Sequence, residues 1–335
     1  MRIRATGTIF IALAAFALWL AGGMAAHAQV RHFSFGYDQP HTTAYGIAAD
    51  TFDAKLKELS GGRFTIDQFP GAQLGQEPQM LQKLRAGDID FIITSTANAS
   101  TVAPQAGVFS LHYIFRDEEH LKKVLADPVV VRAFRDMVAE SVQGAHVMAL
   151  MTMGFRDMYS KKEVKSLEDI KGQKVRVQAT KTEDTHFPAY GAQTVHMPFG
   201  DVYTSLQTGV VNVAENGVNV YLANKHYEVA PVLSMTEHEA NNNAVWVSEK
   251  TWNGLSDEEK RWVQAAADEV GKTEPAKALQ LERDSAVKLK ALGVKIVEGV
   301  DKSGFIKAAL PIQDDLAKEL GPHAVKLLEL VRNVK

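Results

Sequence analysis

The sequence predicts an α/β protein whose chain forms two lobes, and three observations support this. The chain has 335 residues, a length at which two domains or one large domain are expected. Hydrophobic residues make up 46% and charged residues 23% of the chain, the balance of a globular protein with a buried core. Strand and helix patterns alternate between residues 32 and 94, which indicates parallel strands joined by helical crossovers. No repeat or flexible linker separates the parts, so we expect two lobes joined by short crossings.

The first 28 residues have the pattern of a secretory signal peptide. Arg2 and Arg4 precede an apolar run over residues 9–20, and an Ala-His-Ala sequence ends at Ala28. The apolar run is shorter than the ~20 residues that a spanning helix needs, so we expect cleavage after Ala28 rather than anchoring in the membrane. Removal of the two arginines changes the formal net charge from −3 to −5. We therefore predict an exported, periplasmic protein whose mature chain is not embedded in the membrane.

The elements of the first half follow one another in strand–helix order. The pattern predicts strands over residues 32–37, 63–69 and 89–94, and helices over residues 45–59 and 78–85. The first helix has apolar residues every three or four positions, which is the period of one helix face. Gly61 and Gly62 follow this helix and are expected to end it, since glycine readily takes the left-handed conformation found at helix ends.

The second half mixes short strands with longer helices. A helix is expected over residues 202–208, and strands over residues 147–152, 175–178, 210–213, 245–247 and 294–297. From Ser256 the pattern is strongly helical, because a serine N-cap is followed by acidic residues in the first turn. Pro275 is expected to kink or split this stretch, since proline has no amide hydrogen to donate. Two further helices around Gly321 and Pro322 close the chain.

Composition and missing motifs exclude several classes of function. The chain has no cysteine, so it has no disulfide, thiolate nucleophile or cysteine-ligated zinc. Its slightly negative charge offers no overall attraction for nucleic acid. Glycine-rich nucleotide fingerprints and the Gly-x-Ser-x-Gly elbow are absent, and the eleven histidines have no metal-ligand spacing. We therefore expect no enzyme activity, cofactor or metal, although a hydrolase with catalytic residues far apart in the sequence stays open.

Three segments place polar residues at the ends of expected strands. They are residues 154–160 (GFRDMYS), 167–177 (LEDIKGQKVRV) and 198–216 (PFGDVYTSLQTGVVNVAEN). Together they resemble the solute-binding proteins of tripartite ATP-independent periplasmic (TRAP) transporters, the DctP-like family. Four further segments also resemble that family, namely residues 61–63, 69–75, 226–229 and 235–238. The resemblance as a whole extends over about residues 31–300.

The resemblance implies a two-lobed periplasmic binding-protein fold, with a ligand cleft between the lobes and a long helical stretch that bridges them. After the signal peptide (1–28), residues 29–153 with about 242–281 would form lobe I, and residues 154–241 with about 282–335 lobe II. The implied function is capture of a small organic acid, closure of the lobes and delivery to the TRAP membrane permease subunits. A periplasmic hydrolase or lyase and a ligand-sensing protein are the alternatives.

The family pattern also assigns roles to residues of the second lobe. Arg176, in the Lys-x-Arg-Val strand, is expected to bind the ligand carboxylate, which its planar guanidinium matches with two parallel donors. Arg156 matches the second arginine of the cleft, and Asn216 would donate an amide to the same carboxylate. Phe199 is expected to form an apolar wall. Salt bridges within or between the lobes are the alternative roles for the two arginines.

The first lobe is expected to contribute polar groups at the carboxyl ends of its strands, where ligands of α/β sheets bind. The candidates there are Glu77, Ser95, Asn98, Asp38 and His41, and His238 is a further candidate at a crossing between the lobes. The alternatives are that Glu77 only begins a helix and that His238 only caps a strand.

The chain departs from the family pattern in three places. Residues 211–216 lack the glycine of Val-Asp-Gly-x-Glu-Asn. Residues 111–115 (LHYIF) lack the family's proline, and residues 241–243 are three consecutive asparagines. The combination of residues around Arg156, Arg176 and His238 most resembles members that bind sugar acids such as D-glucuronate or D-galacturonate. A C4-dicarboxylate, keto acid or aromatic acid is the alternative, with Arg156 available for a second carboxylate.

Overall fold

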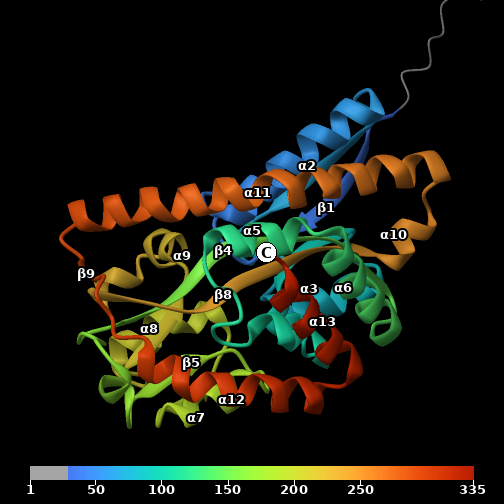
Figure 1. Ribbon diagram of the computed structural model, residues 1–335. Coiled ribbons are helices and arrows are strands. Elements are labelled where there is room, and N and C mark those ends of the chain that lie inside the picture. Colours follow the sequence, from blue (N-terminus) through green and yellow to red (C-terminus); the bar gives the residue numbers. More distant parts are fainter. Residues whose placement is uncertain (1–28) are drawn as a thin grey trace, which may run out of the picture.

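The computed structural model describes residues 29–335 (Figure 1). The predicted signal peptide, residues 1–28, lies outside the described residues. Across residues 29–335, none of the helices combines the length and the apolar character needed to cross a membrane.

The described strands form one mixed sheet in the order β2-β1-β3-β8-β4-β7-β5-β6, with β9 paired to β8. As the sequence predicts, β1 lies parallel to both β2 and β3. Strand β8 is antiparallel to both β3 and β4, so the sheet as a whole is not parallel. The strands are β1 (Arg31–Gly36), β2 (Phe64–Phe69), β3 (Phe91–Ser95), β4 (Ala145–Ser160), β5 (Lys174–Val177), β6 (Gln193–His196), β7 (Val213–Asn216), β8 (Val232–Ser248) and β9 (Lys295–Val297).

Helices cover the sheet, and those expected at residues 45–59 and 78–85 are confirmed as α2 and α3. The helices are α2 (Ala44–Ser60), α3 (Glu77–Ala86), α4 (Thr96–Ala99), α5 (Glu118–Ala126), α6 (Pro128–Ser141), α7 (Glu183–Ala189), α8 (Val202–Thr208), α9 (Val218–Ala223), α10 (Glu249–Asn253), α11 (Asp257–Ala291), α12 (Ser303–Leu320) and α13 (Pro322–Asn333). Four short 3-10 helices also occur, η1 (Pro104–Ser110), η2 (Leu167–Ile170), η3 (Phe199–Asp201) and η4 (His226–Glu228).

Strands β4 and β8 join the two lobes and are much longer than the sequence indicates. The expected strands at residues 147–152 and 245–247 are only parts of them. At one end of this antiparallel pair, β8 also pairs with β3 of the first lobe. At the other end, β4 also pairs with β7 of the second lobe. Both strands are almost wholly buried, so their sequences show no apolar–polar alternation that would reveal their length.

Helix α11 spans both lobes along one side of the molecule (Figure 1). It contacts α2 and β4 near one end and α9 and β9 toward the other. Ser256 and Glu259 form a capping box at its first turn, as the N-cap prediction requires. Of the two outcomes predicted for Pro275, a kink or a split, the split is wrong, because α11 is continuous through that residue. Packing along α2 and β4 holds the helix together across the missing hydrogen bond.

Separate hydrophobic cores lie under the helices of the two lobes. One core of the first lobe packs β1, β3 and α2 against α11, and another packs α5 and α6 against α13. In the second lobe, α8 and α9 share one core, while β5, α7 and α12 share another. The predicted lobe boundaries stay a prediction. The terminal helix α13, which they assign to the second lobe, packs here with α6 and η1 of the first.

Gly154 lies at the irregularity where the pairing of β4 with β8 shifts, and it explains the glycine of the Gly-x-Arg segment. Its φ of +80° lies in the left-handed region, and a Cβ there would come within 2.7 Å of Glu282 Cγ. We expect Gly154→Ala to lower the free energy of unfolding by at least about 1–2 kcal/mol, measured by chemical denaturation. Gly299→Ala is the matched control, because that glycine is exposed and has no neighbour in reach. Equal stability of the two variants would contradict this assignment.

Candidate ligand-binding site

A cavity lies where the strand ends of the two lobes face each other, and its empty volume is about 320 Å³ when the space open to solvent is included. Eight of the ten residues predicted for the site line it, namely Asp38, Glu77, Ser95, Asn98, Arg156, Arg176, Phe199 and Asn216. The remaining lining residues are Gln39, Tyr45, Met153, Gln178, Val220 and Asn241. A wider depression adjoins this cavity, and the two share the residues Asp38, Glu77, Asn98, Arg176, Gln178 and Phe199.

Arg176 is a buried cation without a carboxylate partner among residues 29–335. It lies on β5 and is 3% exposed. Its Nε and Nη2 both donate to the main-chain carbonyl of Met197, at 3.3 and 2.9 Å. The guanidinium carbon lies 5.9 Å from the ring centroid of Phe199. Burial lowers the pKa of Arg176, and the opposing attraction of Glu215, Tyr159 and Asp38, none of which forms an ion pair with it, does not offset this. An anion in the cavity would supply the missing charge.

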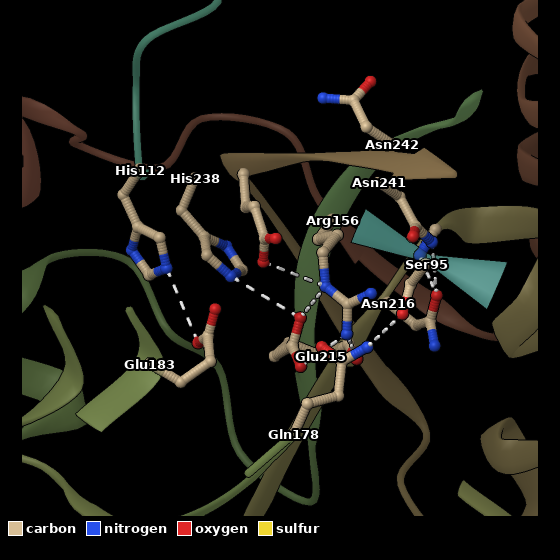
Figure 2. Close-up of polar contacts among 12 residues, drawn as sticks. Ser95, His112, Arg156, Gln178, Glu183, Glu215, Asn216, His238, Asn241 and Asn242 are labelled. Atoms are coloured by element: carbon tan, nitrogen blue, oxygen red, sulfur yellow. Dashed lines mark hydrogen bonds and ion pairs between the residues drawn. The ribbon is translucent and has the colours of Figure 1, made fainter. Parts of the chain in front are cut away.

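Arg156, the second predicted arginine, is in a different electrostatic position (Figure 2). Its Nε and Nη2 donate to the carboxylate of Glu215, with the Nη2–Oε1 distance 2.6 Å. Its Nε also lies 3.3 Å from Glu239 Oε2. Burial alone would lower the pKa of Arg156, but the two glutamates outweigh burial and raise it. Arg156 lowers the pKa of Glu215 in return to about 2, against the effect of burial. The charge of Arg156 is therefore already compensated within the protein.

Asn216 presents an amide donor to the cavity. It follows Glu215 directly on β7, and consecutive strand residues point to opposite faces, so the two side chains reach different surroundings. The Asn216 Oδ1 accepts hydrogen bonds from Gly217 N at 2.9 Å and Asn241 Nδ2 at 2.8 Å. Its oxygen is thus engaged, and no acceptor for Nδ2 occurs within the described chain. This leaves the NH₂ group for an acceptor in the cavity.

The first-lobe wall of the cavity is acidic and centred on Glu77, the first residue of α3. Its Oε2 accepts hydrogen bonds from Ser95 N, Ser95 Oγ and Asn98 Nδ2 at 2.9, 2.8 and 2.7 Å. Its Oε1 lies 2.7 Å from the Tyr45 hydroxyl. Beside it, burial and the neighbouring Glu77 raise the pKa of Asp38. The cavity is therefore basic on one wall and acidic on the other.

Hydrogen bonds connect the lobes around the cavity. Gln178 Nε2, just after β5, donates to Ser95 Oγ at the end of β3, at 3.2 Å. Asn224 Nδ2, just after α9, donates to Gln39 Oε1 at 3.0 Å. Both bonds bridge residues far apart in the sequence, so this structure has the lobes in contact.

Two of the predicted residues do not line the cavity. His41 is exposed, and its Nε2 lies 3.0 Å from Asp50 Oδ1 on the outer side of α2. His238 is buried behind the cavity, where its Nε2 lies 3.7 Å from Glu215 Oε2. It reaches the cavity only through Glu215 and Arg156.

Sequence reasoning missed six lining residues, and only some of them carried a signal. Tyr45 is part of the periodic apolar face of α2, so its hydroxyl was indistinguishable from a core position. Gln178 directly follows the Lys-x-Arg-Val strand, and Asn241 belongs to the unusual run of three asparagines. Of the six missed residues, Gln178 and Asn241 are therefore the two for which the sequence carried a signal.

A larger hollow of about 1300 Å³ lies between α5, α6 and α11. Its polar groups are Arg132, Arg135, Asp136, Asp268 and Lys272, which carry both signs of charge, and the rest of its lining is mostly apolar. Unlike the cavity between the lobes, it does not bring a buried guanidinium to face a set of polar acceptors. The smaller cavity is therefore the candidate binding site.

The fold and this cavity together define a two-lobed solute-binding protein. Residues 35–319 match the DctP family, described as bacterial extracellular solute-binding protein, family 7. The chain belongs to this family, which confirms the resemblance inferred from the three segments.

Known relatives agree with this assignment. The 2,3-diketo-L-gulonate-binding periplasmic protein YiaO of Escherichia coli is 29% identical over 96% of this chain and 98% of its own. A TRAP periplasmic solute binding protein of Xanthobacter autotrophicus Py2, solved with β-D-galacturonate, is 27% identical with a TM-score of 0.84, over 90% of this chain and 100% of its own. Another from Pseudomonas putida F1, solved with D-glucuronate, is 28% identical with a TM-score of 0.85, over 91% and 98%.

The ion pair of Arg156 with Glu215 is expected to be essential for stability. We expect Arg156→Met to lower the free energy of unfolding by about 3–5 kcal/mol, because it leaves a buried carboxylate without its cation. Chemical denaturation measures this loss. The control is Lys290→Met, which removes the cation of the exposed pair with Glu298 and should change stability little. If both substitutions lowered the free energy of unfolding by a similar small amount, the buried pair would contribute nothing to stability.

Proposed function

We propose that this protein captures a uronate-type sugar acid, such as D-glucuronate or D-galacturonate, in the cavity between its lobes and delivers it to TRAP membrane permease subunits. The observation that carries the proposal is Arg176, a buried guanidinium in the cavity with only a main-chain carbonyl as its partner. In this proposal Arg176 and the Asn216 amide bind the ligand carboxylate, and Phe199 packs against the carbon skeleton.

The acidic wall supports a ligand with one carboxylate and several hydroxyls. Glu77 and Asp38 face the arginines across the cavity, and their oxygens are acceptors for sugar hydroxyls. A second carboxylate would instead meet the negative charge of Glu77. Arg156 offers little compensation, since Glu215 already neutralises it. These charges favour a sugar acid over the alternative of a C4-dicarboxylate, and the hydroxyl acceptors favour it over a simple keto or aromatic acid.

The ligands of relatives agree with this proposal. Two structural relatives were solved with D-galacturonate and D-glucuronate, and the E. coli relative is named for a diketo sugar acid. The periplasmic location that we propose rests on the predicted signal peptide and on the periplasmic relatives. We infer a transport role rather than catalysis, so incubated D-glucuronate should be recovered unchanged, and its conversion would instead favour a hydrolase or lyase.

The role of Arg176 is tested by titration calorimetry and thermal shift with a panel of D-glucuronate, D-galacturonate, succinate, pyruvate and benzoate. A uronate should bind best, and Arg176→Met should weaken its binding about 100-fold or more, because two hydrogen bonds to a charged group are lost. Arg261→Met is the control, since that arginine is exposed on α11. Unchanged binding in Arg176→Met, or no response to any acid, would refute the proposal.

The acidic wall gives a separate test of ligand class. We expect wild-type protein to prefer D-glucuronate to succinate, and Glu77→Gln to reduce this preference by about 10-fold or more, since it removes a charge near the second carboxylate. The ratio of the two dissociation constants measures the effect, and a thermal melt verifies folding. Glu258→Gln, an exposed change at the start of α11, should leave the ratio unchanged. Preference for succinate in wild-type protein would instead support a dicarboxylate ligand.

A further inference from the structure

A second polar cluster is buried behind the ligand cavity, and the binding of an organic acid does not use it (Figure 2). We call it the histidine–glutamate cluster and define it as His112, Glu183, His238 and Glu239. His112 follows η1, Glu183 begins α7, and His238 and Glu239 are neighbours on β8. Their exposed fractions are 0%, 0%, 0% and 3%. Three segments far apart in the sequence thus bring two imidazoles and two carboxyl groups into one dry region.

The cluster contains polar atoms that find no hydrogen-bond partner within residues 29–335. These atoms are His112 Nε2, His238 Nε2, Glu239 Oε2 and both carboxyl oxygens of Glu183. His112 Nε2 lies 3.6 Å from Glu183 Oε2, which is too far for a hydrogen bond. One atom from each of His112, His238 and Glu239 lies within 4.8 Å of the others. Two of these atoms have a charged neighbour, since Glu239 Oε2 lies 3.3 Å from Arg156 Nε and His238 Nε2 lies 3.7 Å from Glu215 Oε2. The others, on His112 and Glu183, are costly to bury without a partner unless something occupies the space between them.

In both histidines Nδ1 is engaged by a hydroxyl group, and Nε2 faces the cluster. His112 Nδ1 lies 2.8 Å from the Tyr190 hydroxyl, and His238 Nδ1 lies 2.8 Å from Thr236 Oγ1. Thr236 Oγ1 also accepts a hydrogen bond from Met158 N, so its oxygen is an established acceptor. When Nδ1 donates its proton to such a partner, the Nε2 lone pair is left free to bind a cation.

The formal charges of the region leave room for a dication. Glu183, Glu215 and Glu239 are three buried carboxyl groups, and Arg156 is the cation that pairs with Glu215 and Glu239. If the three are ionised, two negative charges remain without compensation, which is unfavourable in a dry interior. One divalent cation would balance them.

We propose that His112 Nε2, His238 Nε2 and the carboxylates of Glu183 and Glu239 form a buried site for one divalent first-row transition cation. Two imidazole nitrogens and two carboxylate oxygens are a ligand set that Zn²⁺ accepts with tetrahedral geometry. Mg²⁺ and Ca²⁺ prefer oxygen ligands alone and should bind poorly. Tetrahedral zinc requires its ligand atoms about 3.3 Å apart. The cluster is wider than this, so its side chains draw together when the cation binds.

The backbone around the cluster brings these side chains together. Neighbouring strand residues normally point to opposite faces, yet ligand atoms of His238 and Glu239 both reach the cluster. The pairing of β8 with β4 is irregular just before them, and Glu237 has a φ of +43°.

The site is tested on the purified full chain after removal of metal with EDTA. We expect one equivalent of Zn²⁺ to bind and raise the melting temperature, and Co²⁺ to give the visible absorption of a low-coordinate site. Ca²⁺ and Mg²⁺ should not raise the melting temperature. Failure of the wild-type protein to bind an equivalent of Zn²⁺ would overturn the proposal, and two protons would then balance the carboxylates.

Variants then locate the bound cation. Loss of a residue that only supports a metal ligand weakens metal binding by about 10- to 100-fold. His112→Gln and Glu239→Gln each remove a ligand, so each should weaken Zn²⁺ binding by more than this and abolish the Co²⁺ absorption. His196→Gln is the matched control, because that histidine forms an exposed pair with Asp184 of the kind that binds zinc adventitiously. Binding that is lost in His196→Gln but kept in either cluster variant would overturn the proposal. Melting of each metal-free variant verifies its folding. Where a cluster variant does not fold, loss of Zn²⁺ binding in His196→Gln would still overturn the proposal, and retained binding in it would support the proposal.

Discussion

A buried guanidinium that lacks an acidic partner is the constraint on which the binding site depends. Arg176 is held in place by the carbonyl of Met197 and the ring of Phe199, neither of which carries a compensating charge. Arg156, also in the cavity wall, is paired with Glu215 and also lies beside Glu239. Removing a charge from water is costly, so Arg176 needs an anion more than Arg156 does. Under the proposed function, this difference would give the cavity one anionic subsite rather than two.

The frame around this charge consists of long elements that pass through both lobes. Strands β4 and β8 are paired along most of their length, and α11 packs against both lobes. The hydrogen bonds between Gln178 and Ser95 and between Asn224 and Gln39 are few by comparison. The shared strands and α11 therefore hold the two lobes in one frame beside the cavity.

Much of the site followed from local sequence, because strand ends in α/β sheets bring polar residues to one edge. Glu77, Ser95, Asn98 and Arg176 lie there, and eight of the ten expected residues line the cavity. His41 and His238 do not, since their positions depend on how the chain turns after a strand and inside a bulge. Tyr45 was hidden by the apolar periodicity of α2, and the lengths of β4 and β8 were hidden because both strands are buried on both faces.

The sequence by itself determined the family, the α/β alternation and the arginine expected to receive a carboxylate, because these depend on short segments whose residues lie close together in the chain. Only the tertiary structure decided which arginine has a free charge. Glu215 and Glu239 are 59 and 83 positions from Arg156, and no local pattern relates them. Packing likewise kept α11 continuous through Pro275 and gathered His112, Glu183 and His238 from three distant segments. Long-range contacts determine burial, and burial determines which charges need a partner.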